Sequence, residues 1–314
     1  MYLNAVSYKS SYHMNIVLSF IGKLPNYIVD CVHQIRSFSD TPIHLIINDL
    51  DSPYVSQLLK YNINIIHYND VIDTQFINTA NTNINKFKIV PELGDRRQLF
   101  IRSFERFYLL HNLMKTKNLK NCFFMELDNL IYDDPTTWLE QFSKKELCFM
   151  YDNKDRCSSG VMYIKQSSSL VKLLDFFTVF ISTSREFLSE MTCLYRYYEL
   201  HKDEIQLLPI SWKKCNETIS ELAYKNDFFN DSIFDAAAIG VFLLGSDPVH
   251  TKGQILIGRK NEWSAIDYTK EKFVWKKDEK NRNKPYIWDG DKWLLINNLH
   301  VHSKALNTGL SLPF

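Results

Sequence analysis

The sequence predicts an α/β protein built around a Rossmann-type, mostly parallel sheet flanked by helices. Short apolar runs alternate with segments of helical periodicity in the first third of the chain. Such alternation is typical of βαβ units, in which helices cross over between parallel strands. Ligands of these sheets lie beyond the carboxyl ends of the strands, so residues that follow a strand are the first candidates for a site.

The first strand is expected over Asn15–Ile21, where Gly22 ends it. Pro25 suits the first turn of a helix, and apolar residues from Ile28 to Phe38 follow at helical spacing. Three further elements complete the pattern: a buried strand over residues 43–47, a short helix after residue 53 and a third strand over residues 63–67.

The chain from residue 74 to 94 is polar and rich in asparagine, which predicts a flexible surface insert. A long helix, Arg96–Met114, then leads into an apolar strand that begins at Cys122. Further strands are expected over residues 147–151, 160–165 and 204–210, and further helices within 168–181 and 185–201.

Composition narrows the class of protein. The chain has 314 residues, 45% of them hydrophobic, so we expect one large domain over residues 1–314. Because 37 Lys and Arg balance 36 Asp and Glu, general nucleic-acid binding is not expected. The six cysteines show no CxxC spacing and predict reduced thiols in a cytoplasmic protein. No window approaches the roughly 20 apolar residues of a membrane span.

An acid pair stands at the end of the strand that begins at Cys122. Glu126 and Asp128 are one residue apart, and on a continuing strand they would share one face about 7 Å apart. Two such carboxylates repel unless a cation or hydrogen-bond donors lie between them. Mg²⁺ or Mn²⁺ favours carboxylate oxygens, so a metal site is one interpretation and a solvated turn is the other.

The segment Leu299–Lys304, LHVHSK, is a second candidate. His300 and His302 can share one face of an extended segment, and an imidazole ligand suits Mn²⁺ better than Mg²⁺. Lys304 could contact a phosphate as a point charge. The alternative is a surface His-x-His without a partner.

Further candidates lie on four other segments. Small residues before an apolar strand, Ser159 and Gly160, let a ligand approach the backbone. Asp235 precedes three alanines and is either a helix N-cap or a substrate contact. Arg102 and Arg106, one helical turn apart, either reach a phosphate or sugar or are solvated. We also assign ligand binding to Ser19 in the first strand and Asn48 after the second.

In this order, ELDN, SSGVMYI, FDAAAIG and LHVHSK resemble the motifs of the GT-A nucleotide-sugar glycosyltransferases. The resemblance covers roughly residues 15–306, and ELDN stands where the family has its DxD motif. It implies a GT-A-like fold whose nucleotide-binding half spans about residues 1–135 and whose sugar and acceptor half spans about 136–314. The donor it implies is a nucleoside-diphosphate sugar, with a UDP-sugar favoured, and the acceptor a glycan or other hydroxyl compound.

The resemblance also implies roles for individual residues. Asp128 matches the acid that chelates Mn²⁺ or Mg²⁺, whereas Glu126 departs from the family's Asp. A late histidine, His300 or His302, matches a further metal ligand, and Lys304 matches a diphosphate contact. Ser159 and Gly160 match the stretch that lines the donor sugar.

Asp235 matches the acidic position that faces the reacting sugar or acceptor. It is the expected catalytic base if the enzyme inverts the anomeric centre. Two other functions remain open at this stage: a nucleotidyltransferase acting on sugar phosphates, and a non-catalytic protein that binds nucleotide sugars. The first of these should carry a Gly-rich basic loop after its first strand, where this chain has Gly22-Lys23-Leu24-Pro25.

Overall fold

The computed structural model describes residues 13–87, 96–212, 229 and 232–313. Within that part of the chain, a seven-stranded sheet has the order β3-β2-β1-β4-β7-β6-β8. Only β7 among these seven strands runs antiparallel to its neighbours. The predicted α/β class with a mostly parallel sheet flanked by helices is therefore confirmed. The strands are β1 (Asn15–Phe20), β2 (Ile43–Ile47), β3 (Ile63–His67), β4 (Lys120–Met125), β6 (Leu147–Asn153), β7 (Arg156–Gln166) and β8 (Ile205–Leu208).

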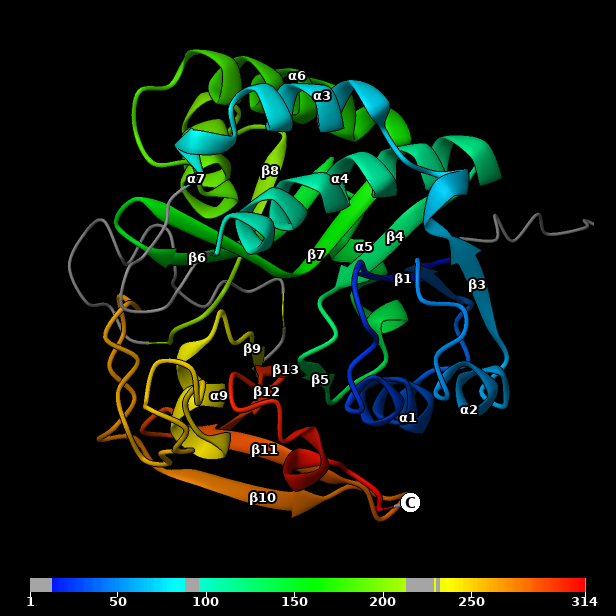
Figure 1. Cartoon of the computed structure of the whole chain (residues 1–314). Helices are drawn as coiled ribbons and strands as arrows, with labels where there is room; N and C mark the ends of the chain where they lie inside the picture. The colour runs from blue at the N-terminus through cyan, green and yellow to red at the C-terminus, as the bar shows by residue number, and fades with distance from the viewer. Residues whose placement is uncertain (1–12, 88–95, 213–228, 230–231, 314) are drawn as a thin grey trace, which may run out of the picture.

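Helices cover both faces of this sheet (Figure 1). On one face lie α1 (Ile28–Phe38) and α2 (Val55–Leu59). On the other lie α3 (Thr74–Thr82), α4 (Arg97–Lys117), α6 (Ser167–Thr183) and α7 (Glu190–Leu200). The apolar residues expected at helical spacing in α1 are those it buries against the sheet. The βαβαβ pattern predicted for the first third of the chain is confirmed.

The prediction of an irregular insert over residues 74–94 is wrong for its first half. Residues 74–82 form α3, whose first turn is capped by the Asp73 side chain, which accepts a hydrogen bond from the Phe76 N–H at 2.8 Å. Phe76 is buried and its ring stacks on Tyr108 of α4 with centroids 4.5 Å apart. A cap and one buried aromatic ring thus outweigh the weak helix propensity of asparagine. Residues 88–95 lie outside the described part of the chain.

A second, smaller sheet follows in the last quarter of the chain and was not predicted. Its order is β10-β11-β12-β9. The strands are β9 (Ser232–Ile233), β10 (Phe273–Lys277), β11 (Asn283–Trp288) and β12 (Trp293–Ile296). The short helix α9 (Ala238–Leu244) lies beside it in Figure 1.

A two-stranded ladder joins the late segment to the main sheet. β13 (Asn298–His300) pairs antiparallel with β5 (Asn129–Ile131), which begins just after the end of β4. In this register His300 lies opposite Asn129. The ladder therefore brings the LHVHSK segment next to the ELDN segment, although more than 160 residues separate them in the sequence.

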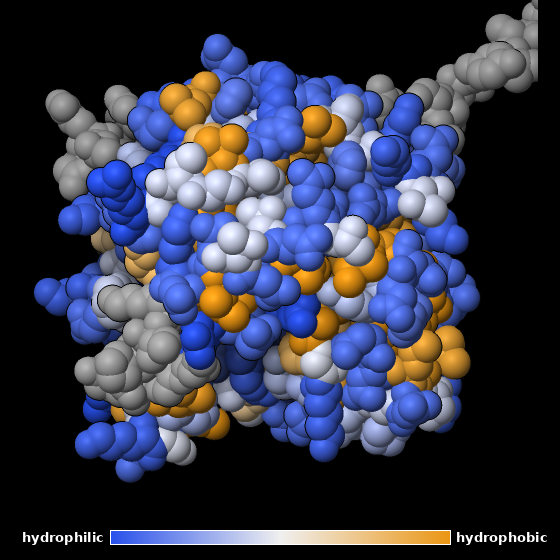
Figure 2. All heavy atoms as spheres, turned by 45° about the horizontal axis from the view of Figure 1, so that its top comes forward, coloured by the Kyte–Doolittle hydropathy of each residue, from blue (hydrophilic) through white to orange (hydrophobic). Residues whose placement is uncertain are grey.

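The core lies between the main sheet and its helices. On the face drawn in Figure 2, hydrophilic residues cover most of the surface and apolar residues appear in separate groups.

The five cysteines that the structure describes are free and buried. Among the described helices, none combines the length and apolarity that crossing a bilayer requires. The division into halves at residue 135 remains a prediction, and β6, β7 and β8 of the second half complete the sheet of the first.

Candidate metal and donor site

The acid pair lies in a turn and not on a strand. β4 ends at Met125, and the Asn129 N–H donates a hydrogen bond to the Glu126 carbonyl at 3.1 Å. The expected alternation of two strand residues 7 Å apart is therefore wrong. The turn folds the two carboxylates toward each other, so that Glu126, Asp128 and His300 each offer a ligand atom within 4.8 Å of the other two.

Main-chain hydrogen bonds hold both acids from two sides. The Glu126 N–H donates to the Gly160 carbonyl of β7 at 2.9 Å. The Val301 N–H, just after β13, donates to the Asp128 carbonyl at 2.7 Å. The positions of the carboxylates thus follow from the fold and need no cation to set them.

His300 is oriented as a metal-binding histidine would be. Its Nε2 atom lies 3.4 Å from Oε2 of Glu126 and 3.4 Å from Oδ2 of Asp128. Its Nδ1 atom lies 3.0 Å from the Ala236 carbonyl, to which an Nδ1–H can donate. In the neutral form that binds a metal, this hydrogen bond would place the Nε2 lone pair toward a cation between the acids, as in ligating histidines. Two carboxylates and one imidazole form a donor set that suits Mn²⁺.

Two glycines make room for His300. A Cβ on Gly160 would lie 3.1 Å from the His300 Nδ1 atom. A Cβ on Gly240 of α9 would lie only 2.1 Å from the His300 carbonyl oxygen. Gly240 is therefore required for the close approach of α9 to the histidine, whereas a Cβ on Gly160 would push the imidazole by a few tenths of an ångström.

Asp235 is buried, and main-chain donors occupy its carboxylate. Oδ1 accepts from the Ile239 N–H at 2.9 Å, and Oδ2 accepts from the Gly240 N–H at 2.7 Å and the His300 N–H at 3.0 Å. Burial raises the pKa of this carboxyl group. Through these three bonds Asp235 ties α9 to His300. Its role as catalytic base stays a prediction.

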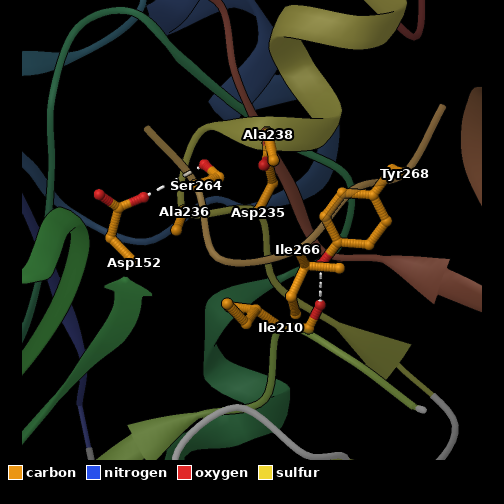
Figure 3. A pocket seen from close by; sticks show the side chains of 8 residues that line it. All are labelled: Asp152, Ile210, Asp235, Ala236, Ala238, Ser264, Ile266 and Tyr268. Carbon is orange, nitrogen blue, oxygen red and sulfur yellow. Dashed lines mark hydrogen bonds between the residues drawn. The ribbon is translucent and has the colours of Figure 1, made fainter. Parts of the chain in front are cut away.

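Asp235 also lines a small cavity that Figure 3 shows from close by. The opposite wall is formed by Asp152, whose Oδ1 accepts from the Ser264 hydroxyl at 3.3 Å. The Tyr268 hydroxyl donates to the Ile210 carbonyl at its other end. With a volume of about 10 Å³, the cavity can hold about one water molecule. It is too small for a sugar.

Lys304 contacts the acid pair directly. Its ammonium donates to Oδ2 of Asp128, and its side chain remains 40% exposed. Burial opposes ionisation of Asp128, but the charges of Lys304 and His300 hold its pKa well below the usual range. Lys304 has φ +61°, a region that costs about 1 kcal/mol for a residue with a Cβ. The backbone thus adopts an unfavourable conformation where the ammonium reaches Asp128.

Arg106 binds the acid pair from inside the protein. Its guanidinium pairs with Oε1 of Glu126, donates to the Ser159 hydroxyl at 2.7 Å and lies 3.1 Å from Glu190. Burial lowers the pKa of this guanidinium, and the negative charges of Glu190 and Asp128 offset part of that shift. In this structure Arg106 and Ser159 belong to a network that positions Glu126, and their contact with a donor stays a prediction.

The remaining expected donor contacts lie farther from the acids. Arg102 pairs with Glu105 and is 3.4 Å from the Tyr68 hydroxyl, and no contact among the described residues joins it to the acid turn. Asn48 accepts a hydrogen bond from the Gly22 N–H at 2.7 Å and so shapes the loop after β1. Ser19 is a half-buried residue of β1.

Three residues of the site were not assigned from the sequence. Glu190 completes the network around Arg106. Tyr27, at the start of α1, lies close enough to Lys304 and Asp128 to feel their charges, while burial raises its pKa to about 12. Asn298 is buried and its side chain bonds Asn129 and the main chain of Asp235. Tyr27 and Asn298 carry no local sequence signal, because their contacts span distant segments.

His302 lies outside the metal-ligand group. β13 ends at His300, two residues before His302. The ring planes of His302 and His300 make an angle of 79°, and their centroids are 4.7 Å apart. Burial, and then the charge of His300, lower the pKa of His302 to about 3. The histidine is therefore neutral, and it faces a separate cavity of about 310 Å³.

Comparison with known proteins gives only distant similarity. No family model and no curated protein matches the sequence. Mouse xyloside xylosyltransferase 1 is similar at 9% identity and TM-score 0.46, over 68% of this chain and 94% of that one. GlyE of Streptococcus pneumoniae TIGR4 is similar at 15% identity and TM-score 0.41, over 62% of this chain but 45% of GlyE. The PaToxG glycosyltransferase follows at 10% identity and TM-score 0.36, over 60% and 70% of the two chains.

All three neighbours are named as glycosyltransferases. That is also the class that the order of the motifs indicates.

Proposed function

We propose that this chain is a metal-dependent glycosyltransferase that moves a sugar from a nucleoside-diphosphate sugar, with UDP-sugars favoured, to a hydroxyl acceptor. One observation carries the proposal. Glu126, Asp128 and His300 converge within 4.8 Å at the carboxyl end of β4, with the ammonium of Lys304 on Asp128. A cation site beside an accessible ammonium, at the ligand-binding edge of a parallel sheet, fits a diphosphate.

The three ligand atoms differ in how they are held. Asp128 and His300 approach from segments that the β5–β13 ladder joins, and Glu126 is shared with Arg106. We therefore assign Asp128 and His300 as the principal metal ligands and Glu126 as the third. Mn²⁺ is favoured over Mg²⁺ because one ligand is an imidazole. A bound divalent cation would supply Lewis-acid stabilisation of the leaving diphosphate.

Lys304 supplies the second positive charge of the site. Because 40% of its side chain is exposed, the ammonium can meet a phosphate as well as Asp128. Its position next to the acids lets it stabilise negative charge that develops on the nucleoside diphosphate as the glycosidic bond breaks. Tyr27 and the loop after β1, which Asn48 shapes, lie at the same edge and would contact the nucleotide.

The proposal is tested with Asp128→Asn. Titration of the wild-type protein with UDP in the presence of Mn²⁺ should give binding that EDTA removes, and the variant should lose about 100-fold in affinity. Asp133→Asn is the matched control, because Asp133 follows β5 closely but pairs with Lys284 at 3.4 Å. Equal Mn²⁺-dependent binding by wild type and Asp128→Asn would refute the metal assignment.

Turnover separates an enzyme from a binding protein. The wild-type protein with Mn²⁺ should slowly hydrolyse a UDP-sugar in the absence of an acceptor, since water can replace the hydroxyl. Tight UDP binding without release of sugar from any of several UDP-sugars would favour the non-catalytic alternative. The five buried free cysteines that the structure describes support our proposal of a reducing, cytoplasmic compartment.

A further inference from the structure

The cavity next to His302 is not lined by any of the three proposed metal ligands, Glu126, Asp128 and His300. Its volume is about 310 Å³, which lies in the range of small-molecule sites, roughly 300–1,000 Å³. Its lining includes Asp247, Arg259, Lys260, Glu262, Trp263 and His302. Since His302 contacts the ring of His300, the cavity adjoins the proposed metal site.

The lining combines polar side chains with apolar surface, and its charges cancel. Two cations, Arg259 and Lys260, face two anions, Asp247 and Glu262, and hydroxyl, amide and imidazole groups make up most of the rest. Lys260 lies 3.7 Å from Glu262. An apolar ligand would leave these groups unpaired, and a strongly charged one would have no excess of opposite charge. A neutral compound with many hydroxyl groups can pair with all of them.

Trp263 is an aromatic residue held in place with its ring exposed. Trp263 as a whole residue is 67% exposed. Its carbonyl accepts hydrogen bonds from Asn153 at 2.6 Å and from Arg156 at 3.2 Å, and both donors lie at the β6–β7 turn. The Arg156 guanidinium also lies 5.8 Å from the centroid of the indole ring. An exposed indole at the edge of this cavity is suited to pack against the C–H face of a sugar ring, because indole is flat, apolar and rigid.

We propose that this cavity is the acceptor site and that the acceptor is a neutral saccharide whose ring packs on Trp263. The inference rests on the proposed function and names the acceptor class. In the transfer, the acceptor hydroxyl oxygen bonds to the anomeric carbon of the donor. The bond from that carbon to the diphosphate oxygen breaks with its electron pair on the diphosphate, and the hydroxyl proton passes to water.

The test is an array of neutral glycans, acidic glycans and peptides, probed with the fluorescently labelled full chain in the presence of UDP and Mn²⁺. Wild type should bind neutral glycans, and Trp263→Ala should lose about 10-fold or more in affinity, as for an aromatic anchor of an interface. Trp263→Phe should keep most of the binding, because it retains an aromatic face. Trp275→Ala is the matched control, since Trp275 is 38% exposed and packs on Tyr132 away from the cavity.

Thermal unfolding of each variant shows that it is folded, and titration of the same samples with UDP and Mn²⁺ reports on the metal site. Binding only to acidic glycans or peptides, or equal glycan binding by Trp263→Ala and wild type, would overturn the acceptor assignment. Wild type that binds UDP with Mn²⁺ but no glycan would also overturn it and leave the proposed function standing. Failure of wild type to bind UDP with Mn²⁺ would refute the proposed function itself.

Discussion

Gly240→Ala should damage the metal site although Gly240 would not touch a metal. The added Cβ would stand 2.1 Å from the His300 carbonyl oxygen and 2.9 Å from Oδ2 of Asp235, where ordinary contact begins at 3.4 Å. Helix α9 and β13 must therefore separate by about 1 Å. The separation stretches the bonds by which the Gly240 and His300 N–H groups reach Asp235, now 2.7 and 3.0 Å long.

The magnitude follows from these contacts. Alanine gains about 1 kcal/mol of helix propensity over glycine. Overpacking costs about 1–3 kcal/mol, and the two stretched hydrogen bonds together cost about 1.5–3 kcal/mol, the worth of one full hydrogen bond to a charged group. We expect a net loss of about 2–5 kcal/mol in the free energy of unfolding, measured in urea by tryptophan fluorescence. Displacement of the ligating imidazole should lower Mn²⁺ affinity about 10- to 100-fold, measured by calorimetry.

Gly290→Ala is the control for this substitution. Gly290 has φ +106° and no heavy atom within 4 Å of an added Cβ, so alanine should cost about 1–2 kcal/mol through the backbone alone. Mn²⁺ affinity should be unchanged in this variant. If Gly240→Ala had the same stability and Mn²⁺ affinity as wild type, the inferred close contact between α9 and β13 would be refuted.

Two further predictions concern the histidine pair and a surface carboxylate. His300→Ala should lower Mn²⁺ affinity about 100-fold, whereas His302→Ala should change it only a few-fold, because His302 lies outside the ligand group; equal losses in calorimetry would contradict the assignment. Asp278→Asn should lower the free energy of unfolding at pH 7 by about 1–2 kcal/mol, because the carboxylate accepts hydrogen bonds from the main chain and from Arg282 at 2.7 Å. Burial opposes ionisation of Asp278, but the Arg282 hydrogen bond lowers its pKa, so this stabilisation is present above about pH 4, the pKa in the unfolded chain. This stabilisation is lost as the pH falls through the lower pKa that Asp278 has in the folded state. In urea unfolding at pH 2, wild type and variant should therefore have similar free energies of unfolding. A difference that persists at pH 2 would show that the carboxylate charge is not the source of the stabilisation.

Local pattern was sufficient for most of the main sheet. The run IHLII is the β2 strand with the bounds expected from its apolar residues, and the spacing from Ile28 to Phe38 matches α1. Both signals are carried by neighbouring residues, so they survive without tertiary information. The local pattern did not predict α3, because helix formation there depends on a tertiary contact: Phe76 packs on Tyr108 of another helix.

The small sheet shows where pattern reasoning ends. Its strand β10 reads FVWKK and β9 has two residues, so neither has the alternation that predicts a strand. Pairing with β11 and β12 makes them strands. Such pairing is a long-range contact that a single sequence does not display.

The roles of the site residues divide in the same way. The sequence alone determined that two acids follow a buried strand, and that two histidines and a lysine lie close together near the end of the chain. Only the tertiary structure decided that His300 meets the acids while His302 faces a cavity, because the β5–β13 register places His300 opposite Asn129. It likewise decided that Asp235 supports His300, since the main-chain partners of its carboxylate come from α9 and β13. Residue types set which chemistry is available, whereas strand pairing across more than 160 residues sets which side chains meet.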